Sequence, residues 1–232
     1  MWLLQAVAVE VDLVFRDPCF VVVDKPSGVV VHRGFASDAE DLMRAVRDRV
    51  GARVYPVHRL DRGTSGAVVM ALSVDAARAF GKAFEEGRVE KRYLAITRGH
   101  PKDGDIDHPV PNREDGPKVP AVTRVRCLGT AGRYALVEAV PVTGRLHQIR
   151  RHLKHVSCPI IGDVKYGKGE HNRHFREQYG LHRLALHATE LAFDHPETGA
   201  RQQFVVPPKG ALRACMDALG LRDSALSPVR HL

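Results

Sequence analysis

Residues 57–66 read VHRLDRGTSG, and the chain continues directly into the apolar run AVVMAL at 67–72. The segment holds one carboxylate, Asp61, between two arginines, Arg59 and Arg62. An arginine stays protonated in proteins, so its presence favours the ionised form of a nearby carboxylate. The glycines and small hydroxyl residues that follow allow the backbone angles and local hydrogen bonds of a turn. We therefore predict a charged loop held by a rigid strand, an arrangement in which proteins often present a reactive group.

The composition is that of an ordinary globular protein with a basic surface. The chain has 232 residues, 44% of them hydrophobic, with a net charge of +8 and a pI of about 9.6. This length allows one substantial core or two small domains. An excess of positive charge indicates an anionic partner, most often nucleic acid.

Cysteine usage and the N-terminal sequence indicate a cytoplasmic location. The four cysteines are scattered and form no CxxC pair, which argues against a zinc ribbon and against a secreted disulfide framework. The apolar N-terminus lacks a basic start and soon reaches Glu10 and Asp12, unlike a signal peptide. No apolar stretch approaches the length of a membrane span.

The apolar patterns predict more strands than helices and no regular alternation of the two. Strands are expected at 11–15, 20–23, 67–72, 91–96, 121–127, 134–140, 183–193 and 203–206. Helices are expected from a cap at Asp38 to Val50, from a cap at Ser73 to about Glu86, from Arg145 to Val156, and from Pro208 to about Leu219. Residues 101–120 are predicted to form a turn-rich surface insertion, and residues 165–180 a polar loop with short helical turns. The pattern favours the α+β class with a mixed, mainly antiparallel sheet and flanking helices.

A basic segment, VTGRLHQIRRHL, occupies residues 142–153. Its apolar residues fall on one helical face, and its remaining positions carry arginine, histidine and lysine with no acidic residue before Val156. A basic helix beside a glycine turn is suited to meeting phosphate. The alternative is an ordinary solvated helix face. Such a face normally mixes both signs of charge, so the absence of acidic residues here argues against it.

Several of these stretches resemble one family. The sequence HRLDRGTSG with its apolar strand resembles the catalytic loop of the RluA-type pseudouridine synthases. The segments DKPSGVVVH, KRYLA, TGRLHQIRRH, PIIGD and LHRLALHA resemble further motifs of that family in the same order, from about Asp24 to Phe193. The resemblance implies a catalytic domain over residues 1–221. Many members of the family carry an extra N-terminal RNA-binding domain of the S4 type, but the first strands and the DKPSG motif begin so early here that we expect none. Residues 222–232 are expected to form a flexible tail.

The resemblance also implies isomerisation of uridine to pseudouridine within RNA, with no cofactor and no metal. Asp61 is expected as the nucleophile, Tyr93 as the aromatic residue that stacks on the uracil, and Arg150 as the arginine that pairs with Asp61. A carboxylate can attack C1′, add to C6 or remove a proton from the sugar, and the sequence leaves all three routes open. Arg62 would help to flip the nucleotide out of its stack. The residues expected to bind RNA are Arg62, Arg59, His58, Arg145, His147 and Arg151.

Each of these residues also has a structural interpretation. Tyr93 could be a core aromatic residue with its hydroxyl at the rim. Arg150 could be a phosphate contact only, and Arg62 could simply screen Asp61. The histidines of the basic segment do not match an HExxH spacing and have no grouped cysteines or carboxylates, so we expect them to be structural or to face RNA.

Two other functions are less consistent with the sequence. A glycoside or nucleoside hydrolase generally needs two carboxylates flanking the bond, whereas the motifs here offer one acid and several arginines. A non-catalytic RNA-binding protein would have no use for an acid in the middle of a positive surface. The resemblance is strongest to the branch of the family that modifies uridine 65 of tRNA, with ribosomal RNA as the alternative substrate. The expected partner is RNA, and the expected form is a monomer that does not bind membranes.

Overall fold

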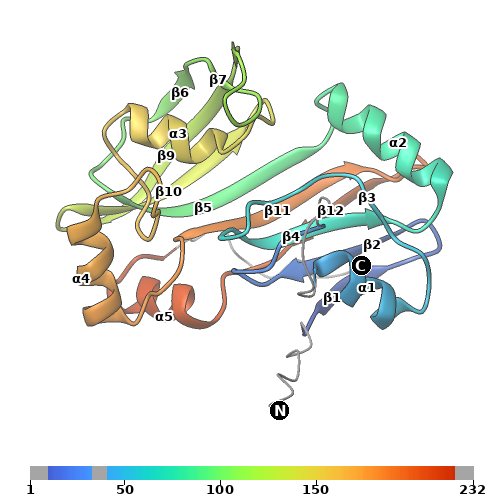
Figure 1. The fold of residues 1–232 in the computed structure, drawn as a ribbon, viewed down its shortest axis with the longest axis horizontal. Helices are drawn as coiled ribbons and strands as arrows, with labels where there is room; N and C mark the ends of the chain where they lie inside the picture. Colours follow the sequence, from blue (N-terminus) through green and yellow to red (C-terminus); the bar gives the residue numbers. More distant parts are fainter. Residues whose placement is uncertain (1–9, 33–40, 223–232) are drawn as a thin grey trace. The chain divides into compact units, whose positions relative to one another are not determined.

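The structure is a computed structural model that describes residues 10–32 and 41–222. The chain divides into two compact units, most of whose elements are labelled in Figure 1. Unit 1 takes its described residues from the ranges 1–89 and 192–204, and unit 2 takes its own from 90–191 and 205–232. The tail predicted at 222–232 lies almost entirely outside the described residues.

Unit 1 is organised around two buried strands. Strands β1 (Asp12–Arg16), β2 (Phe20–Lys25) and β4 (Ser65–Ala71) are antiparallel neighbours in that order, and the short β3 (Tyr55–Pro56) also pairs with β4. Every residue of β4 is buried, as are all residues of β2 except Asp24. Strands covered on both faces have continuous apolar sequences of this kind rather than alternating ones.

An aromatic cluster forms the core of unit 1. It joins the rings of Phe15, Phe20, Phe80, Phe193 and Phe204, with neighbouring centroids 5.0 to 5.9 Å apart. Aromatic pairs favour tilted and edge-to-face contacts at these separations. Two of the rings come from the end of β11 (Leu186–Asp194) and from β12 (Arg201–Val205), so unit 1 is completed by residues late in the sequence.

The helices of unit 1 begin and end largely where the sequence predicts. In α2 (Val74–Glu85), the side chain of Ser73 accepts a hydrogen bond from the Ala76 amide, as expected of its cap. Helix α1 (Leu42–Val50) ends at Gly51 in the left-handed conformation, also as predicted. Its cap is Asp41, and the predicted cap Asp38 lies outside the described residues.

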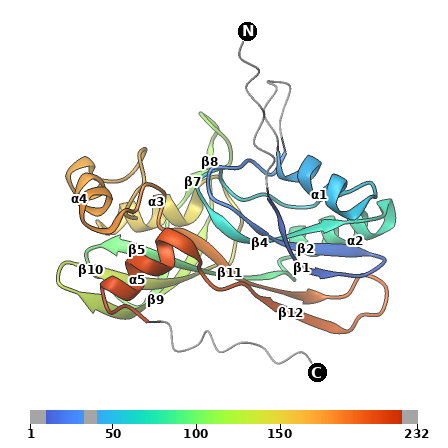
Figure 2. The same ribbon diagram turned by 90° about the horizontal axis from the view of Figure 1, so that it is seen from below.

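Unit 2 contains a second antiparallel arrangement, in the order β5 (Glu90–Arg98), β10 (Tyr134–Pro141), β9 (Val122–Ala131) and β6 (Gly104–Asp107). A separate hairpin joins β7 (Val110–Pro111) to β8 (Lys118–Val119). Helix α3 (Gln148–His155) packs against β9 and β10. Helix α4 (Gly169–Tyr179) contacts α5 (Gly210–Ala218), and Figure 2 shows α5 running across the strands whose side chains it joins in the core.

The mainly antiparallel strands, together with five helices among the described residues, confirm the predicted α+β class. None of these helices has both the length and the apolar character needed to cross a lipid bilayer.

Two local predictions were wrong, and a third was right only in part. Residues 165–180 contain the regular helix α4 rather than a loop. Residues 101–120 are largely exposed, as predicted, but they also contain β6 and the β7–β8 hairpin. Helix α3 begins at Gln148 rather than at Arg145. The Gln148 side chain accepts hydrogen bonds from the Thr143 hydroxyl and the Arg145 amide, which holds residues 143–147 in a turn before the helix.

Candidate active site

The loop of residues 57–64 leads into β4, as the sequence predicts, and its main chain is fixed by the Lys25–Val29 turn of unit 1. The Gly28 amide donates to the Arg62 carbonyl at 2.7 Å, and the Ser27 hydroxyl donates to the Gly63 carbonyl at 2.7 Å. Within the loop, the Thr64 amide donates to the Asp61 carbonyl at 3.0 Å. Asp61 is half-buried on this fixed backbone.

Lys25 is a fully buried cation beneath the loop. Its Nζ donates to the carbonyl oxygens of Pro26, Val29 and Arg62, at 2.9, 2.6 and 3.3 Å. A buried ammonium group needs such acceptors because its desolvation is costly. The KPSG segment is thus more than a turn, since it ties its own backbone to that of the residue after Asp61. The sequence analysis missed this role, although a lysine at the end of an apolar strand was a visible signal.

The three other predicted residues of the loop have different environments. The His58 ring stacks on Phe84 with centroids 4.8 Å apart, and its Nε2 accepts a hydrogen bond from the Val69 amide at 3.0 Å. These contacts join His58 to the scaffold of unit 1. Arg59 and Arg62 are exposed, and Arg62 Nε donates to the Gly28 carbonyl at 2.8 Å.

Tyr93 lies on β5 of unit 2, opposite Ala139 of β10. It is half-buried, with one part packed against the core of that unit. Its neighbour Arg92 forms ion pairs with Glu138 and Glu190, at 3.0 and 3.3 Å. The tyrosine is therefore held by packing along a well-paired strand while part of its surface stays accessible.

The basic segment 142–153 presents fewer charges to solvent than the sequence suggests. Arg145 is exposed and Arg151 is half-buried, but His152 is fully buried and bonds to the Thr123 hydroxyl and the His108 carbonyl. Burial lowers the pKa of His152. This histidine is structural.

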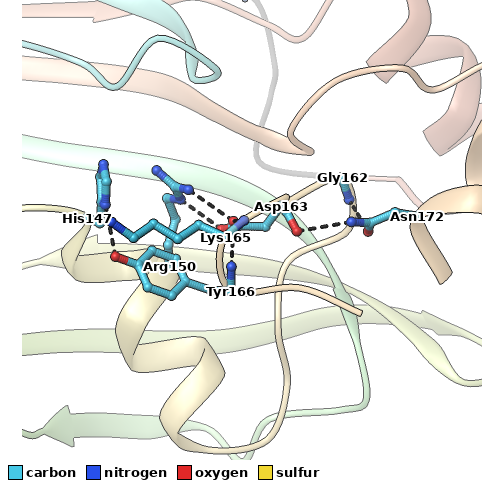
Figure 3. Close-up of polar contacts among 7 residues, drawn as sticks. All are labelled: His147, Arg150, Gly162, Asp163, Lys165, Tyr166 and Asn172. Atoms are coloured by element: carbon cyan, nitrogen blue, oxygen red, sulfur yellow. Dashed lines mark hydrogen bonds and ion pairs between the residues drawn. The ribbon is translucent and has the colours of Figure 1, made fainter. Parts of the chain in front are cut away.

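Arg150 is also buried, and in unit 2 it forms a bidentate ion pair with Asp163 (Figure 3). Its Nε donates to Oδ2 at 2.7 Å and its Nη2 to Oδ1 at 3.0 Å. Burial alone would raise the pKa of Asp163, but the hydrogen bonds from Arg150 and from the Lys165 and Tyr166 amides outweigh it and lower the pKa. In the sequence, Asp163 stands out only as the last residue of the PIIGD motif, because nothing local in that motif reveals a partner thirteen residues earlier.

The Tyr166 ring lies close to the cationic groups of Arg150, Arg151 and Lys165. Its ring centroid is 5.0 Å from the Arg150 guanidinium carbon and 5.2 Å from that of Arg151, and its hydroxyl bonds to His147 Nδ1 at 3.0 Å (Figure 3). His147 adopts a left-handed conformation with φ of 53°, which is uncommon outside glycine and is fixed here by the start of α3. His147 therefore precedes the helix, and its side chain bonds to Tyr166.

One group of potential metal ligands occurs within residues 10–32 and 41–222, in unit 1. Ligand atoms of Asp17, Cys19 and His195 lie within 4.8 Å of one another. However, His195 Nδ1 accepts from the amides of Glu197 and Thr198, so its Nε2 carries the proton and donates to Asp17 at 2.8 Å. Burial raises the pKa of the Cys19 thiol to about 11. The His195–Asp17 hydrogen bond joins two turns of the unit, which gives this group a structural role.

Comparison with known proteins gives a consistent family. Residues 19–155 match the family described as RNA pseudouridylate synthase. A protein of Haemophilus ducreyi named tRNA pseudouridine synthase C is 41% identical over 212 residues, covering 82% of this chain and 87% of that protein. The protein of the same name from Salmonella typhimurium is 42% identical over 212 residues, covering 81% of this chain and 82% of its own.

Solved structures agree with the sequence relatives. Human RNA Pseudouridylate Synthase Domain Containing 4 superimposes with a TM-score of 0.75 at 28% identity, covering 91% of this chain and 94% of that one. Human RNA Pseudouridylate Synthase Domain Containing 1 gives a TM-score of 0.72, also at 28% identity, covering 89% of this chain and 87% of that one. The sequence match spans the Asp61 loop, β5 and α3, and the structural match extends over both units. The chain therefore belongs to the RNA pseudouridylate synthase family.

Proposed function

We propose that this enzyme isomerises uridine 65 of tRNA to pseudouridine. The observation that carries the substrate is the identity of about 40% with relatives named tRNA pseudouridine synthase C, over some four-fifths of this chain. The reaction breaks the N1–C1′ bond, rotates the uracil and forms a C5–C1′ bond, with loss of the C5 proton and gain of one at N1. Nothing is oxidised or hydrolysed, so the reaction needs no cofactor.

Asp61 is the nucleophile in this proposal. This assignment is supported by the main chain at Asp61, which the hydrogen bonds from the Lys25–Val29 turn hold in one position. Preorganisation of this kind lowers the entropy that the reaction must lose. Attack on C1′, addition to C6 and removal of a sugar proton all use the ionised carboxylate.

Tyr93 and Arg150 are the other proposed catalytic residues. Tyr93 offers a ring face for stacking on the base and a hydroxyl for proton transfer. Arg150 keeps the nucleophile ionised and in place, because a guanidinium group favours the charged form of a carboxylate. Arg62 helps to flip the nucleotide out of its stack, which its exposed position allows.

The surface around Tyr166 contacts the RNA backbone. Arg151 Nε is buried and has no hydrogen-bond partner among the described residues, a costly state that a phosphate oxygen would relieve. His147 and Lys165 lie against the same ring. Together with Arg145, Arg59 and His58, they are the proposed RNA contacts.

Release of tritium from RNA labelled at uridine C5 tests the proposal, because that hydrogen must leave when C5 bonds to C1′. Bulk tRNA and ribosomal RNA are offered separately to the wild type and to Asp61→Asn. We expect release from tRNA with the wild type alone and retention of tRNA binding by the variant. A tRNA transcript with cytidine at position 65 is expected to release nothing.

Other outcomes change different parts of the proposal. Release only from ribosomal RNA would keep the reaction and replace the substrate. Full activity in Asp61→Asn would remove the nucleophile assignment, and binding without release by the wild type would favour an RNA-binding role. A cytoplasmic, monomeric enzyme is part of the same proposal, and size-exclusion chromatography at enzyme concentrations checks the monomer.

A further inference from the structure

Asp163 holds one edge of the Arg150 guanidinium group. The two hydrogen bonds use the Nε hydrogen and one Nη2 hydrogen, and a guanidinium group is rigid and planar. Its opposite end, formed by Nη1 and the second Nη2 hydrogen, therefore points away from Asp163. The position of the Asp163 carboxylate therefore determines the direction in which the opposite end of the guanidinium group points.

The Asp163 carboxylate is itself fixed by the main chain. Its Oδ1 also accepts from the amides of Lys165 and Tyr166, at 2.9 and 3.0 Å. Its side chain is fully buried in the structure. Both carboxylate oxygens thus have defined donors, and rotation about the side-chain bonds would break several of these hydrogen bonds at once.

The backbone of Asp163 is anchored in turn. Its carbonyl accepts from the Gly167 amide at 3.1 Å and from Asn172 Nδ2 at 3.0 Å, while Asn172 Oδ1 accepts from the Gly162 amide at 2.8 Å (Figure 3). A Cβ on Gly162 would lie 1.9 Å from the Arg183 carbonyl oxygen, and one on Gly167 would lie 2.3 Å from the Asp163 carbonyl oxygen. Only glycine therefore fits at 162, where the chain packs against Arg183, and at 167, where it packs against the Asp163 carbonyl.

The guanidinium face has its own support. The Arg150 guanidinium carbon lies 5.0 Å from the Tyr166 ring centroid, and the Tyr166 hydroxyl bonds to His147 (Figure 3). Arg150 is therefore constrained at an edge by charge and at a face by an aromatic ring. Two different constraints on one arginine leave it little freedom to turn.

Stability alone is a poor reason for this arrangement. Burying two opposite charges costs desolvation energy that often cancels their attraction, and an apolar pair frequently serves a core equally well. What a buried bidentate pair does provide is a fixed direction for the arginine.

We propose that Asp163 is the positioning residue for Arg150: it orients the guanidinium group for the reaction while making no contact with RNA itself. The inference rests on the proposed role of Arg150. Asn172 and the two glycines extend the same support outward.

The test compares kcat and KM for tRNA in Asp163→Asn, Arg150→Ala and the double variant. Asp163→Asn is expected to lower kcat roughly 10- to 100-fold, a loss typical of a misplaced catalytic group, with KM changed by less than about threefold. Because Asp163 acts through Arg150, the double variant should be no slower than Arg150→Ala. The matched control is Asp105→Asn, which removes the exposed partner of Arg124 in the same unit and should keep the wild-type kcat.

Chemical rescue supplies a readout that a purely structural role would not change. Millimolar guanidinium chloride should restore part of the activity of Arg150→Ala, since the Asp163 carboxylate can bind the ion in place of the side chain. The double variant should show no rescue. Equal rescue of both variants would overturn the proposal.

The outcomes separate this inference from the proposed function. No tritium release by the wild type would defeat the proposed function, and full activity of Arg150→Ala would defeat the role of Arg150; the inference would fail with either. The inference alone would be overturned if the wild type is active and Arg150→Ala is inactive, but Asp163→Asn keeps the wild-type kcat. Fully additive losses in the double variant would overturn it in the same way. If Asp163→Asn does not fold, Asp163→Glu keeps the charge but displaces it: a folded variant with lower kcat and unchanged KM supports the proposal, and one with wild-type kcat overturns it.

Discussion

Gln148 shows how a single side chain can set the start of a helix. Its amide oxygen accepts from Thr143 and Arg145, and its amide nitrogen donates to the Val122 carbonyl and the Thr123 hydroxyl, each at 2.9 Å. The side chain is buried, so no water replaces a lost partner. Gln148 therefore connects the turn before α3 to strand β9.

We expect Gln148→Glu to lower the free energy of unfolding by about 2 kcal/mol or more, because both amide donations are lost and an acid is buried. Urea denaturation of the two proteins measures the difference. Gln178→Glu, the same change at an exposed position of α4, should alter stability by less than about 0.5 kcal/mol. Equal effects at both sites would contradict the assignment.

His187 makes the stability of unit 2 depend on pH. It is buried on β11 and donates from Nε2 to the Val206 carbonyl, and burial lowers its pKa from 6.5 to about 4. In the unfolded chain the histidine takes up a proton below its ordinary pKa near 6.5, while the folded form stays neutral until about pH 4. Its contribution is thus present above pH 6.5 and is lost as the pH falls toward 4.

Denaturation curves of wild type and His187→Gln at several pH values test this contribution. The glutamine keeps an amide donor but does not titrate. Between pH 6.5 and 4 the wild type is expected to lose up to about 3 kcal/mol more stability than the variant. Parallel pH dependences would show that another group is responsible.

At the scale of elements, the β7–β8 hairpin carries an acid into the proposed RNA surface. Glu114, in the turn, forms an ion pair with Lys165. That hydrogen bond and the charge of Lys165 lower the pKa of Glu114, and the charges of His147 and Arg151 act in the same direction. The carboxylate is therefore ionised at neutral pH among the cations that phosphate would meet.

Glu114→Gln is expected to bind tRNA roughly two- to fivefold more tightly, with a salt dependence steeper by about one ion, because Lys165 becomes available to a phosphate. Filter binding at several salt concentrations measures both. Asp115→Asn makes the same change of charge on the neighbouring residue, which is exposed and has a positive φ that asparagine tolerates. The same gain in both variants would show that only net charge matters.

The elements also show where sequence patterns succeed. Strand β4 and helix α2 were predicted closely because their apolar residues and the Ser73 cap are local signals. Helix α4 was missed because two of the residues on its buried face are polar: His171 bonds to the Tyr134 hydroxyl and Asn172 to the Asp163 loop. Strand β6 was missed because it lies at the edge of its sheet and buries only Ile106.

The candidate site divides in the same way. Asp61 and its loop stand out in the sequence because the charges are adjacent. The Arg150–Asp163 pair depends on how the chain between α3 and α4 folds back on itself, which no local pattern encodes. Partners that meet through tertiary structure, such as Lys25 with the Arg62 carbonyl, need the fold to become visible.

At the scale of the whole molecule, the boundaries of the two units fall at or inside strands. One precedes the first residue of β5, one lies within β11 and one within β12. The aromatic core of unit 1 correspondingly draws Phe15, Phe20 and Phe80 from the first part of the chain and Phe193 and Phe204 from near its end.

Because unit 1 combines early and late residues, it cannot be completed until the late residues have been synthesised. Asp61 is synthesised well before Phe193 and Phe204, the two rings that complete the aromatic core of its unit. Until then the nascent chain exposes apolar strands, the state in which aggregation competes with folding and chaperones are most useful. Translation that stops before residue 193 would therefore yield a fragment that carries the Asp61 loop and the turn that anchors it, but lacks two rings of the aromatic core.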